Sequence, residues 1–306
     1  MMNTFTGWKL GLVLALISAI FWGLLPIALA ITLAGLDAFT ITWFRFTLAA
    51  FVLGAVLTMT RGLPAVRSFS GSIWPLLSIA LAGLAGNYLL FLVALRYSSP
   101  TVAQLLAQFA SIFLLLGGLL IFKESFSRLQ WAGLALLVFG LLLFFNRRLP
   151  ELRYVFQGLG LGVTVGVLSS LVWAAYGLAQ KRLLRQLGSQ QILLLLYFGA
   201  AVTLLPVATP GAIPQMNSLQ FGMLAFCSVN TLVAYGAFAE ALRQWQVSRV
   251  SAVIASAPLF TLVSMWLAER FVPHLVIPER LNNASVAGAL LVVAGSAICA
   301  LSRPKA

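Results

Sequence analysis

Long apolar runs alternate with short polar connections along the whole chain. Ten of these runs are long enough, at about 20 residues, to cross the apolar core of a bilayer as a helix. They cover residues 10–34, 38–60, 74–96, 101–122, 129–146, 157–181, 190–209, 216–242, 249–268 and 284–302. No connection between them is long enough for a soluble domain. The pattern therefore predicts an all-α integral membrane protein with ten transmembrane helices.

Composition supports the membrane prediction and removes one function class. The chain has 306 residues, of which 61% are hydrophobic and 8% are charged, whereas a soluble domain carries about 25% charged residues. A net charge of +13 would suggest nucleic-acid binding in a soluble protein. Here the basic residues lie in short loops between apolar runs, where they set orientation and contact anionic headgroups. Nucleic acid is therefore not an expected partner.

The distribution of Lys and Arg predicts the orientation in the membrane. If the N-terminus is cytoplasmic, twelve basic residues fall on the cytoplasmic side and six on the opposite side. This asymmetry favours two cytoplasmic termini. Arg147, Arg148 and Arg153, in the central connection, argue against it locally.

The chain contains an internal repeat. Residues 94–124 and 241–269 both begin with Ala-Leu-Arg and both end on a glutamate. Further matches pair Ser18 and Trp22 with Ser169 and Trp173, Tyr88 with Tyr235, and Gly133 and Gly140 with Gly288 and Gly295. The repeat predicts two halves, residues 1–150 and 151–306, with five spans each. An odd number of spans inverts one half relative to the other, which is typical of secondary transporters that bind substrate where the halves meet.

Polar and aromatic side chains inside the spans are candidates for the lining of a central cavity. Amide side chains in hydrocarbon must find partners or water, and the repeat-matched Trp and Tyr residues share helix faces with them. The candidates are Ser18, Trp22, Asn87, Tyr88, Gln104, Gln108, Ser169, Trp173, Tyr176, Asn230 and Tyr235. For any one of them, hydrogen bonding that holds two helices together is the alternative.

Two charged residues and two prolines inside spans are candidates for coupling or gating. Arg45 lies about seven residues into its span, where its long side chain can snorkel outward; binding of a substrate carboxylate is the alternative. Glu240 precedes Arg243 by three residues, which favours a helical ion pair, with proton coupling as its alternative. Pro26 and Pro258 predict hinges or simple kinks.

The sequence lacks the motifs of membrane-embedded enzymes. There is no HExxH, CxxC, GxSxG or Walker-type glycine loop, Asp37 is the only aspartate and His274 the only histidine. Cys227 and Cys299 lie in apolar runs without metal-type spacing, so we expect buried free thiols. No metal or cofactor is expected, and the function should be movement or binding rather than catalysis.

These features together resemble a known family. Two five-helix halves, each with an Ala-Ser pair, an apolar run to a closing glutamate and a Gly-x6-Gly helix, resemble the EamA-domain branch of the drug/metabolite transporter superfamily. The segment ASAPLFTLVSMWLAE is the best match, because the family favours a proline before that glutamate. The first copy departs from the pattern, with Phe113 where the second has Pro258.

Within that family, the tryptophan-bearing first span and the aromatic cavity resemble the amino-acid exporters of bacterial inner membranes. The resemblance implies ten helices, a central cavity lined by both halves, and export of neutral amino acids. The cavity candidates and the inverted halves predict a secondary exporter of small neutral or zwitterionic metabolites, such as aromatic amino acids, methionine and threonine, that works by alternating access. A monomer is expected. Its partners would be the small-molecule substrate and the lipid bilayer.

Three other functions stay open at this point. Multidrug efflux of lipophilic cations would need a buried carboxylate, which the spans lack near their centres. Exchange of organic phosphates would need basic residues in the cavity, for which Arg45 is the one candidate. A non-transporting scaffold or receptor would not need two matched cavity walls.

Overall fold

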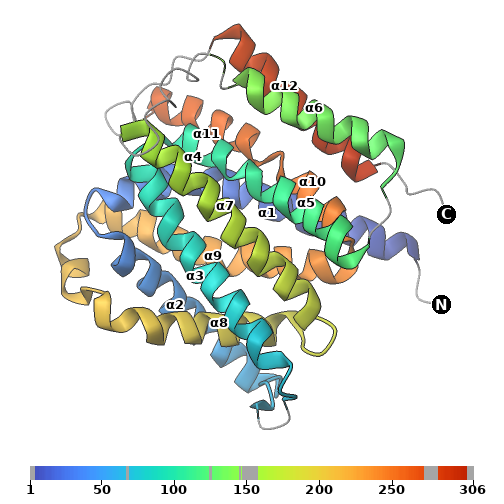
Figure 1. Ribbon diagram of the computed structural model, residues 1–306. Helices are drawn as coiled ribbons and strands as arrows, with labels where there is room; N and C mark the ends of the chain where they lie inside the picture. Colours follow the sequence, from blue (N-terminus) through green and yellow to red (C-terminus); the bar gives the residue numbers. More distant parts are fainter. Residues whose placement is uncertain are drawn as a thin grey trace.

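The computed structural model describes residues 4–66, 69–123, 126–144, 146, 158–271 and 282–301, and every regular element in these ranges is helical (Figure 1). The helices, in chain order, are α1 (Thr4–Leu33), α2 (Ala38–Met59), α3 (Ile73–Arg96), α4 (Pro100–Leu106), α5 (Gln108–Phe122), α6 (Arg128–Phe144), α7 (Gly158–Leu183), α8 (Ser189–Leu204), η3 (Leu205–Val207), η4 (Pro210–Gln215), α9 (Ser218–Gln244), α10 (Val247–Ile254), α11 (Ala257–Phe271) and α12 (Asn283–Leu301).

Within the described ranges, eight helical stretches are long and apolar enough to cross a membrane. They are Trp8–Leu33, Ala38–Met59, Ile73–Arg96, Pro100–Phe122, Gly160–Leu183, Ser189–Val207, Ser218–Gln244 and Val247–Arg270. Two shorter apolar helices, Arg128–Phe144 and Asn283–Gly295, coincide with the fifth and tenth predicted runs. The prediction of a helical, membrane-spanning chain is confirmed.

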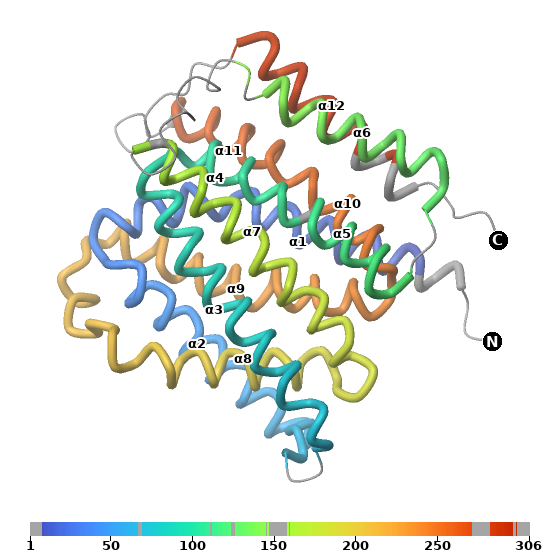
Figure 2. The backbone as a smooth tube through the Cα atoms, in the orientation of Figure 1, coloured from blue at the N-terminus to red at the C-terminus, as the bar shows by residue number. Residues whose placement is uncertain are grey.

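The helices pack as a bundle in which segments far apart in sequence lie side by side. α3 packs on α7, α1 on α9, α2 on α8, and α6 on α12 (Figure 2). The start of α1 and the end of α12 lie at the same end of the bundle in Figure 1. Most helices bury one face in a large core of Leu, Ala and aromatic side chains. A second, smaller cluster joins α6 and α12 to residues of α4.

The outer surface of the bundle is apolar. Phe51 is 74% exposed, Met59 84% and Leu120 74%. A water-facing surface rarely carries so many large exposed apolar side chains. These positions are instead suited to contact with lipid tails.

Glycines allow α6 and α12 to touch through their backbones. A Cβ atom on Gly140 would lie 2.7 Å from the carbonyl oxygen of Gly288, and one on Gly288 would lie 2.6 Å from that of Gly140. A Cβ atom on Gly295 would lie 2.5 Å from the carbonyl oxygen of Gly133. The four glycines that the repeat pairs in sequence therefore meet each other across one helix–helix contact, as small residues do in membranes.

Asp37 joins the start of α2 to the connection between α8 and α9. Its Oδ1 accepts hydrogen bonds from the backbone N–H groups of Phe39 (2.8 Å) and Thr40 (3.0 Å). Its Oδ2 accepts from the Thr209 hydroxyl at 3.0 Å and from the Thr40 hydroxyl. Partial burial raises the pKa of Asp37, but the hydrogen bonds from Thr40, Thr209 and Phe39 outweigh it and lower the pKa overall.

Two of the predicted continuous spans are broken. The run 101–122 divides at Ala107 into α4 and α5, and the run 249–268 divides after Ile254 into α10 and α11. At each break the backbone switches locally to hydrogen bonds over three residues, from Ala110 N–H to Ala107 O (3.0 Å) and from Ser256 N–H to Val253 O (3.0 Å). Both runs remain helical stretches of membrane-spanning length, Pro100–Phe122 and Val247–Arg270, each interrupted by one short turn.

Candidate functional site

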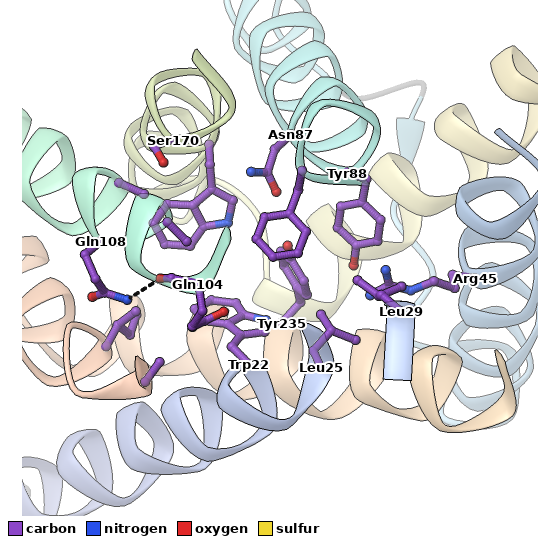
Figure 3. Close-up of a pocket in the computed structure, with 16 residues that line it drawn as sticks. Trp22, Leu25, Leu29, Arg45, Asn87, Tyr88, Gln104, Gln108, Ser170 and Tyr235 are labelled. Atoms are coloured by element: carbon purple, nitrogen blue, oxygen red, sulfur yellow. Dashed lines mark hydrogen bonds between the residues drawn. The ribbon is translucent and has the colours of Figure 1, made fainter. Parts of the chain in front are cut away.

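One cavity lies inside the bundle, between α1, α2, α3, α7, α9 and the two broken helices (Figure 3). About 80 Å³ is open to the centres of water-sized molecules, which is room for several waters. Its lining residues are Trp22, Leu25, Leu29, Arg45, Asn87, Tyr88, Phe91, Gln104, Ala107, Gln108, Ala110, Ser170, Trp173, Tyr235, Ile254 and Ala257. The wall is mostly apolar and aromatic, with a few polar groups, as small-molecule sites commonly are.

Both helix breaks lie on this wall. Ala107 stands at the first break, and Ile254 and Ala257 flank the second. Irregular backbone at membrane depth is tolerated where it is buried in protein or lines a cavity. The backbone stays close to helical at both breaks, since Ala107 and Ala255 keep αR dihedral angles.

Side chains take up the carbonyl groups around the first break. The Ser170 hydroxyl on α7 donates to the carbonyl of Leu106, the last residue of α4, at 2.8 Å. The Gln108 Nε2 donates to the Gln104 carbonyl at 3.1 Å, which leaves the buried Gln108 Oε1 without a partner among the described residues. Side-chain donors thus satisfy the two carbonyl groups at the break, and the Gln108 Oε1 stays unpaired on a residue that lines the cavity.

Aromatic rings close one side of the cavity. The Trp22 ring centroid lies 5.4 Å from that of Trp173 and 5.1 Å from that of Tyr235. Phe238, one turn further along α9, lies 5.4 Å from Trp22 and 5.0 Å from Trp173. These T-shaped and tilted contacts are the favoured geometry for aromatic pairs. The repeat-matched tryptophans of the two halves therefore touch each other.

Arg45 lies at the opposite end of the cavity from Gln104 and Gln108 (Figure 3). Its side chain is 2% exposed, so the expectation that it snorkels outward is wrong. Its Nε donates to the Cys227 carbonyl (3.1 Å) and the Thr231 hydroxyl (3.0 Å), one turn apart on α9. These two acceptors and the Tyr88 ring, 4.3 Å from the Arg45 Cζ, hold the head inside the bundle.

Seven of the eleven predicted cavity residues line the cavity, and Arg45 lines it too. The seven are Trp22, Asn87, Tyr88, Gln104, Gln108, Trp173 and Tyr235. The structure also adds Ser170, which directly follows a predicted residue in the sequence.

The other four predicted residues are buried between helices. The Ser18 hydroxyl donates to the Ala234 carbonyl at 2.9 Å, and the Ser169 hydroxyl donates to the Asn87 carbonyl at 3.2 Å. Asn230 donates to the carbonyl of Phe21. Tyr176 is fully buried, with its hydroxyl unpartnered among the described residues. Ser18, Ser169 and Asn230 therefore follow the alternative of hydrogen bonding between helices.

The remaining gating candidates lie off the cavity wall. Glu240 forms the predicted pair with Arg243, at 3.5 Å, and also accepts a hydrogen bond from Ser189 at 2.9 Å. Pro26 lies within α1, which stays continuous, and Pro258 is the second residue of α11. A proline in the first turn of a helix lacks no needed donor, so Pro258 is accommodated there, directly after the break between α10 and α11.

The described ranges hold no group of three or more His, Cys, Asp or Glu residues placed to bind a metal ion. Cys227 is a buried free thiol, as expected. The side chain of Cys299, and the residues Glu124 and His274, lie outside the described part of the chain.

A profile of a known family matches the chain twice. The EamA-like transporter family matches residues 9–146 and again residues 160–301. Among solved structures, one crystal structure superposes with a TM-score of 0.70 over 95% of this chain and 96% of its own, at 17% identity. At that identity the likeness concerns the fold alone.

Several bacterial transporters are similar to the chain over nearly its whole length. An "Uncharacterized transporter" of Haemophilus influenzae is 42% identical over 95% of both chains. The "Uncharacterized inner membrane transporter YhbE" of Escherichia coli K12 is 42% identical over 95% of this chain and 91% of its own. A "Probable amino-acid metabolite efflux pump" of Salmonella typhimurium is 24% identical over 92% of both chains.

Proposed function

Because the chain belongs to the EamA-like transporter family, we propose that it exports small neutral or zwitterionic metabolites, with amino acids such as the aromatic ones, methionine and threonine as the leading class. The observation that carries this proposal is the cavity itself. Both broken helices and the Trp22–Trp173 pair meet on its wall.

The chemistry of the wall suits an amino acid with an apolar side chain. The rings of Trp22, Trp173 and Tyr235 can cover an aromatic or aliphatic group. Asn87, Gln104 and Gln108 offer neutral hydrogen-bonding groups at other points of the wall. The printed name of the Salmonella typhimurium relative, an amino-acid metabolite efflux pump, agrees with this substrate class.

The proposed framework is ten membrane-crossing helices in two inverted halves, residues 1–150 and 151–306. Reciprocal packing supports it, since α3 of the first half packs on α7 of the second, while α9 of the second packs on α1 of the first. The hydrogen bonds repeat too: Ser169 donates to the carbonyl of Asn87, and its counterpart Ser18 donates to that of Ala234. Each half thereby supplies the same contact to the other.

We infer alternating access, which the position of the cavity along the helices supports. With both termini cytoplasmic, the lining residues lie in the middle and the outer parts of α1, α2 and α3. The aromatic cluster of Trp22, Trp173 and Phe238 extends toward the cytoplasmic ends of α7 and α9. Rocking of one half against the other would open this cluster and load the cavity from the cytoplasm. The membrane is the bacterial inner membrane, the location printed for the Escherichia coli relative.

Ligand-dependent thermal stability of the purified protein tests the substrate class. A ligand that binds only the folded state stabilises it by about 2.7 kcal/mol at a hundredfold excess over its Kd. Phenylalanine, tryptophan, methionine and threonine should raise the melting temperature, whereas a sugar phosphate and tetraphenylphosphonium should not. A shift with the phosphate or the lipophilic cation, and none with the amino acids, would contradict the proposal.

A further inference from the structure

Arg45 is a charged group buried in the middle of a membrane protein. It is 2% exposed and is the one fully charged side chain among the described residues that line the cavity. An arginine head keeps its proton in proteins. Burying such a charge without a counterion costs far more than burying a neutral polar group.

The contacts around Arg45 compensate its charge only in part. The Cys227 carbonyl and the Thr231 hydroxyl accept from Nε, and the Tyr88 ring faces the head. All three partners are neutral. The buried Nη2 has no hydrogen-bond partner among the described residues, and a charged donor left unpaired is rare in folded proteins.

No described carboxylate neutralises Arg45. Asp37 is occupied at the start of α2, where it accepts from Thr40 and Thr209. Glu240 pairs with Arg243 near the end of α9. No acidic residue lines the cavity within the described ranges. The described wall of the cavity therefore carries one positive charge and no negative charge.

We propose that Arg45 binds the carboxylate of the transported molecule, which makes the carboxylate, and not the ammonium group, the obligatory feature of the substrate. The inference rests on the proposed export function and names the recognition element within it. A guanidinium can donate two parallel hydrogen bonds to a carboxylate. Here Nε donates to α9, and neither Nη1 nor Nη2 donates a hydrogen bond within the described residues.

The rest of the wall fits the body of such a molecule. A carboxylate at Arg45 places the attached group beside Tyr88, Tyr235 and Leu25, which lie between Arg45 and the two glutamines in Figure 3. An α-ammonium group would meet neutral acceptors only, such as the amide oxygen of Asn87, whose Nδ2 donates to the Ser169 hydroxyl at 2.9 Å. The substrate class is thus a carboxylate with an apolar or aromatic body, with α-amino acids as members, and lipophilic cations are repelled.

Three ligands of the same shape separate the two charged groups. L-Phenylalanine carries both charges, 3-phenylpropionate carries only the carboxylate, and phenylalanine amide carries only the ammonium group. The melting temperature of the purified protein is measured with each, in chloride-free sulfate buffer, followed by flux in proteoliposomes. We expect stabilisation by phenylalanine and by phenylpropionate and none by the amide.

Arg45 variants assign the effect to this residue. In Arg45→Gln, the apparent affinity for both carboxylates should fall by about tenfold to a hundredfold, the usual size for loss of a charged hydrogen-bond pair. Arg45→Lys keeps the positive charge but loses the paired guanidinium donors, so it should retain part of the affinity. Arg96→Gln, on an exposed arginine, is the matched control and should bind like the wild type. Without ligand, Arg45→Gln should melt no lower than the wild type, because the change removes an uncompensated buried charge; a lower melting temperature with unchanged affinity would assign Arg45 a structural role instead.

The outcomes separate this proposal from the export function. If the amide stabilises and is transported as well as phenylalanine, and Arg45→Gln changes neither, the carboxylate site is refuted while export stands. If phenylpropionate binds through Arg45 but no amino acid is transported, the carboxylate site stands and amino-acid export fails. If added chloride alone stabilises the protein and the organic acids add nothing, Arg45 holds an inorganic anion and the proposal is overturned.

Discussion

Trp22 is placed by an unusual set of contacts to the backbone of α1. Pro26 has no N–H to donate to the Trp22 carbonyl. The carbonyls on either side, of Phe21 and Gly23, accept hydrogen bonds from Asn230 on α9 and from Thr261 on α11. Hydrogen bonds from α9 and α11 thus support α1 where one of its own backbone hydrogen bonds is missing. These hydrogen bonds flank Trp22 and help to position its ring against Trp173.

Loss of either tryptophan ring should reduce transport. In Trp22→Ala and Trp173→Ala, we expect substrate affinity to fall by about tenfold, because a ring contact of about 1 to 1.5 kcal/mol is removed. Trp22→Phe should retain most of the affinity. Trp131→Ala is the control, since Trp131 is 47% exposed on the outer face of α6. Unchanged flux in both alanine variants would assign these rings to packing alone.

Asp37 should make stability depend on pH. The fold lowers the pKa of Asp37 below the unfolded-state value of 3.8. The carboxylate therefore contributes to the free energy of unfolding above pH 3.8, and this contribution is lost as the pH falls through the pKa of the folded state. Asp37→Ala should cost about 1 kcal/mol at neutral pH as a lost helix cap, and the difference from the wild type should shrink as the pH falls below 3.8. Asp37→Asn keeps an acceptor and should show a flatter pH profile. Thermal melts over this pH range check both, and a cost that stays constant in acid would contradict the assignment.

Sequence reasoning identified the polar positions but could not sort them. Ser18 and Ser169 stand one helical turn before Trp22 and Trp173, which line the cavity, and Asn230 lies on the same helix as Tyr235. Their hydroxyl and amide groups point to backbone carbonyls of other helices, which no pattern within one helix reveals. The inward direction of the Arg45 side chain is equally invisible in the sequence of α2, because its hydrogen-bond acceptors lie on α9.

At the scale of the helices, the span boundaries were predictable to within a few residues and the breaks were not. Ala107 is a strong helix former, so nothing in its own chemistry marks the end of α4. At the break, the Leu106 and Gln104 carbonyls accept instead from the Ser170 hydroxyl on α7 and from the Gln108 amide. The second break did have a local signal, Pro258, which begins α11.

The contact between α6 and α12 should be sensitive to a single added methyl group. Gly288→Ala places a Cβ 2.6 Å from the Gly140 carbonyl oxygen, and we expect a loss of about 1 to 3 kcal/mol from overpacking. Gly222→Ala, within α9 and with open space around the new Cβ, should be neutral or slightly stabilising. Thermal melts compare the two variants. Equal melting temperatures would show that the close approach of α6 and α12 contributes nothing to stability.

At the scale of the whole molecule, the distribution of acidic residues bears on energy coupling. Glu240 is the acid nearest a span centre in the sequence, yet it pairs with Arg243 and Ser189 near the helix end. No acidic residue in the described ranges faces the cavity. This arrangement favours downhill export that follows the substrate gradient.

Glu240→Gln should therefore leave transport largely intact. We expect flux within about twofold of the wild type, because an exposed helical ion pair is worth only about 0.5 kcal/mol. The rate should not depend on an imposed pH gradient in either protein. Flux in proteoliposomes with and without that gradient is the measurement. A pH-driven flux in the wild type that disappears in Glu240→Gln would establish proton coupling through this residue.

Export of amino acids is tested most directly by measuring the efflux of radiolabelled amino acids from proteoliposomes that contain the folded protein. We predict that phenylalanine or tryptophan leaves these proteoliposomes faster than it leaves protein-free liposomes. This efflux should be saturable, and it should be lower with Trp22→Ala but not with Trp131→Ala. No efflux of phenylalanine, tryptophan, methionine or threonine, from protein whose thermal melt shows it to be folded, would contradict it.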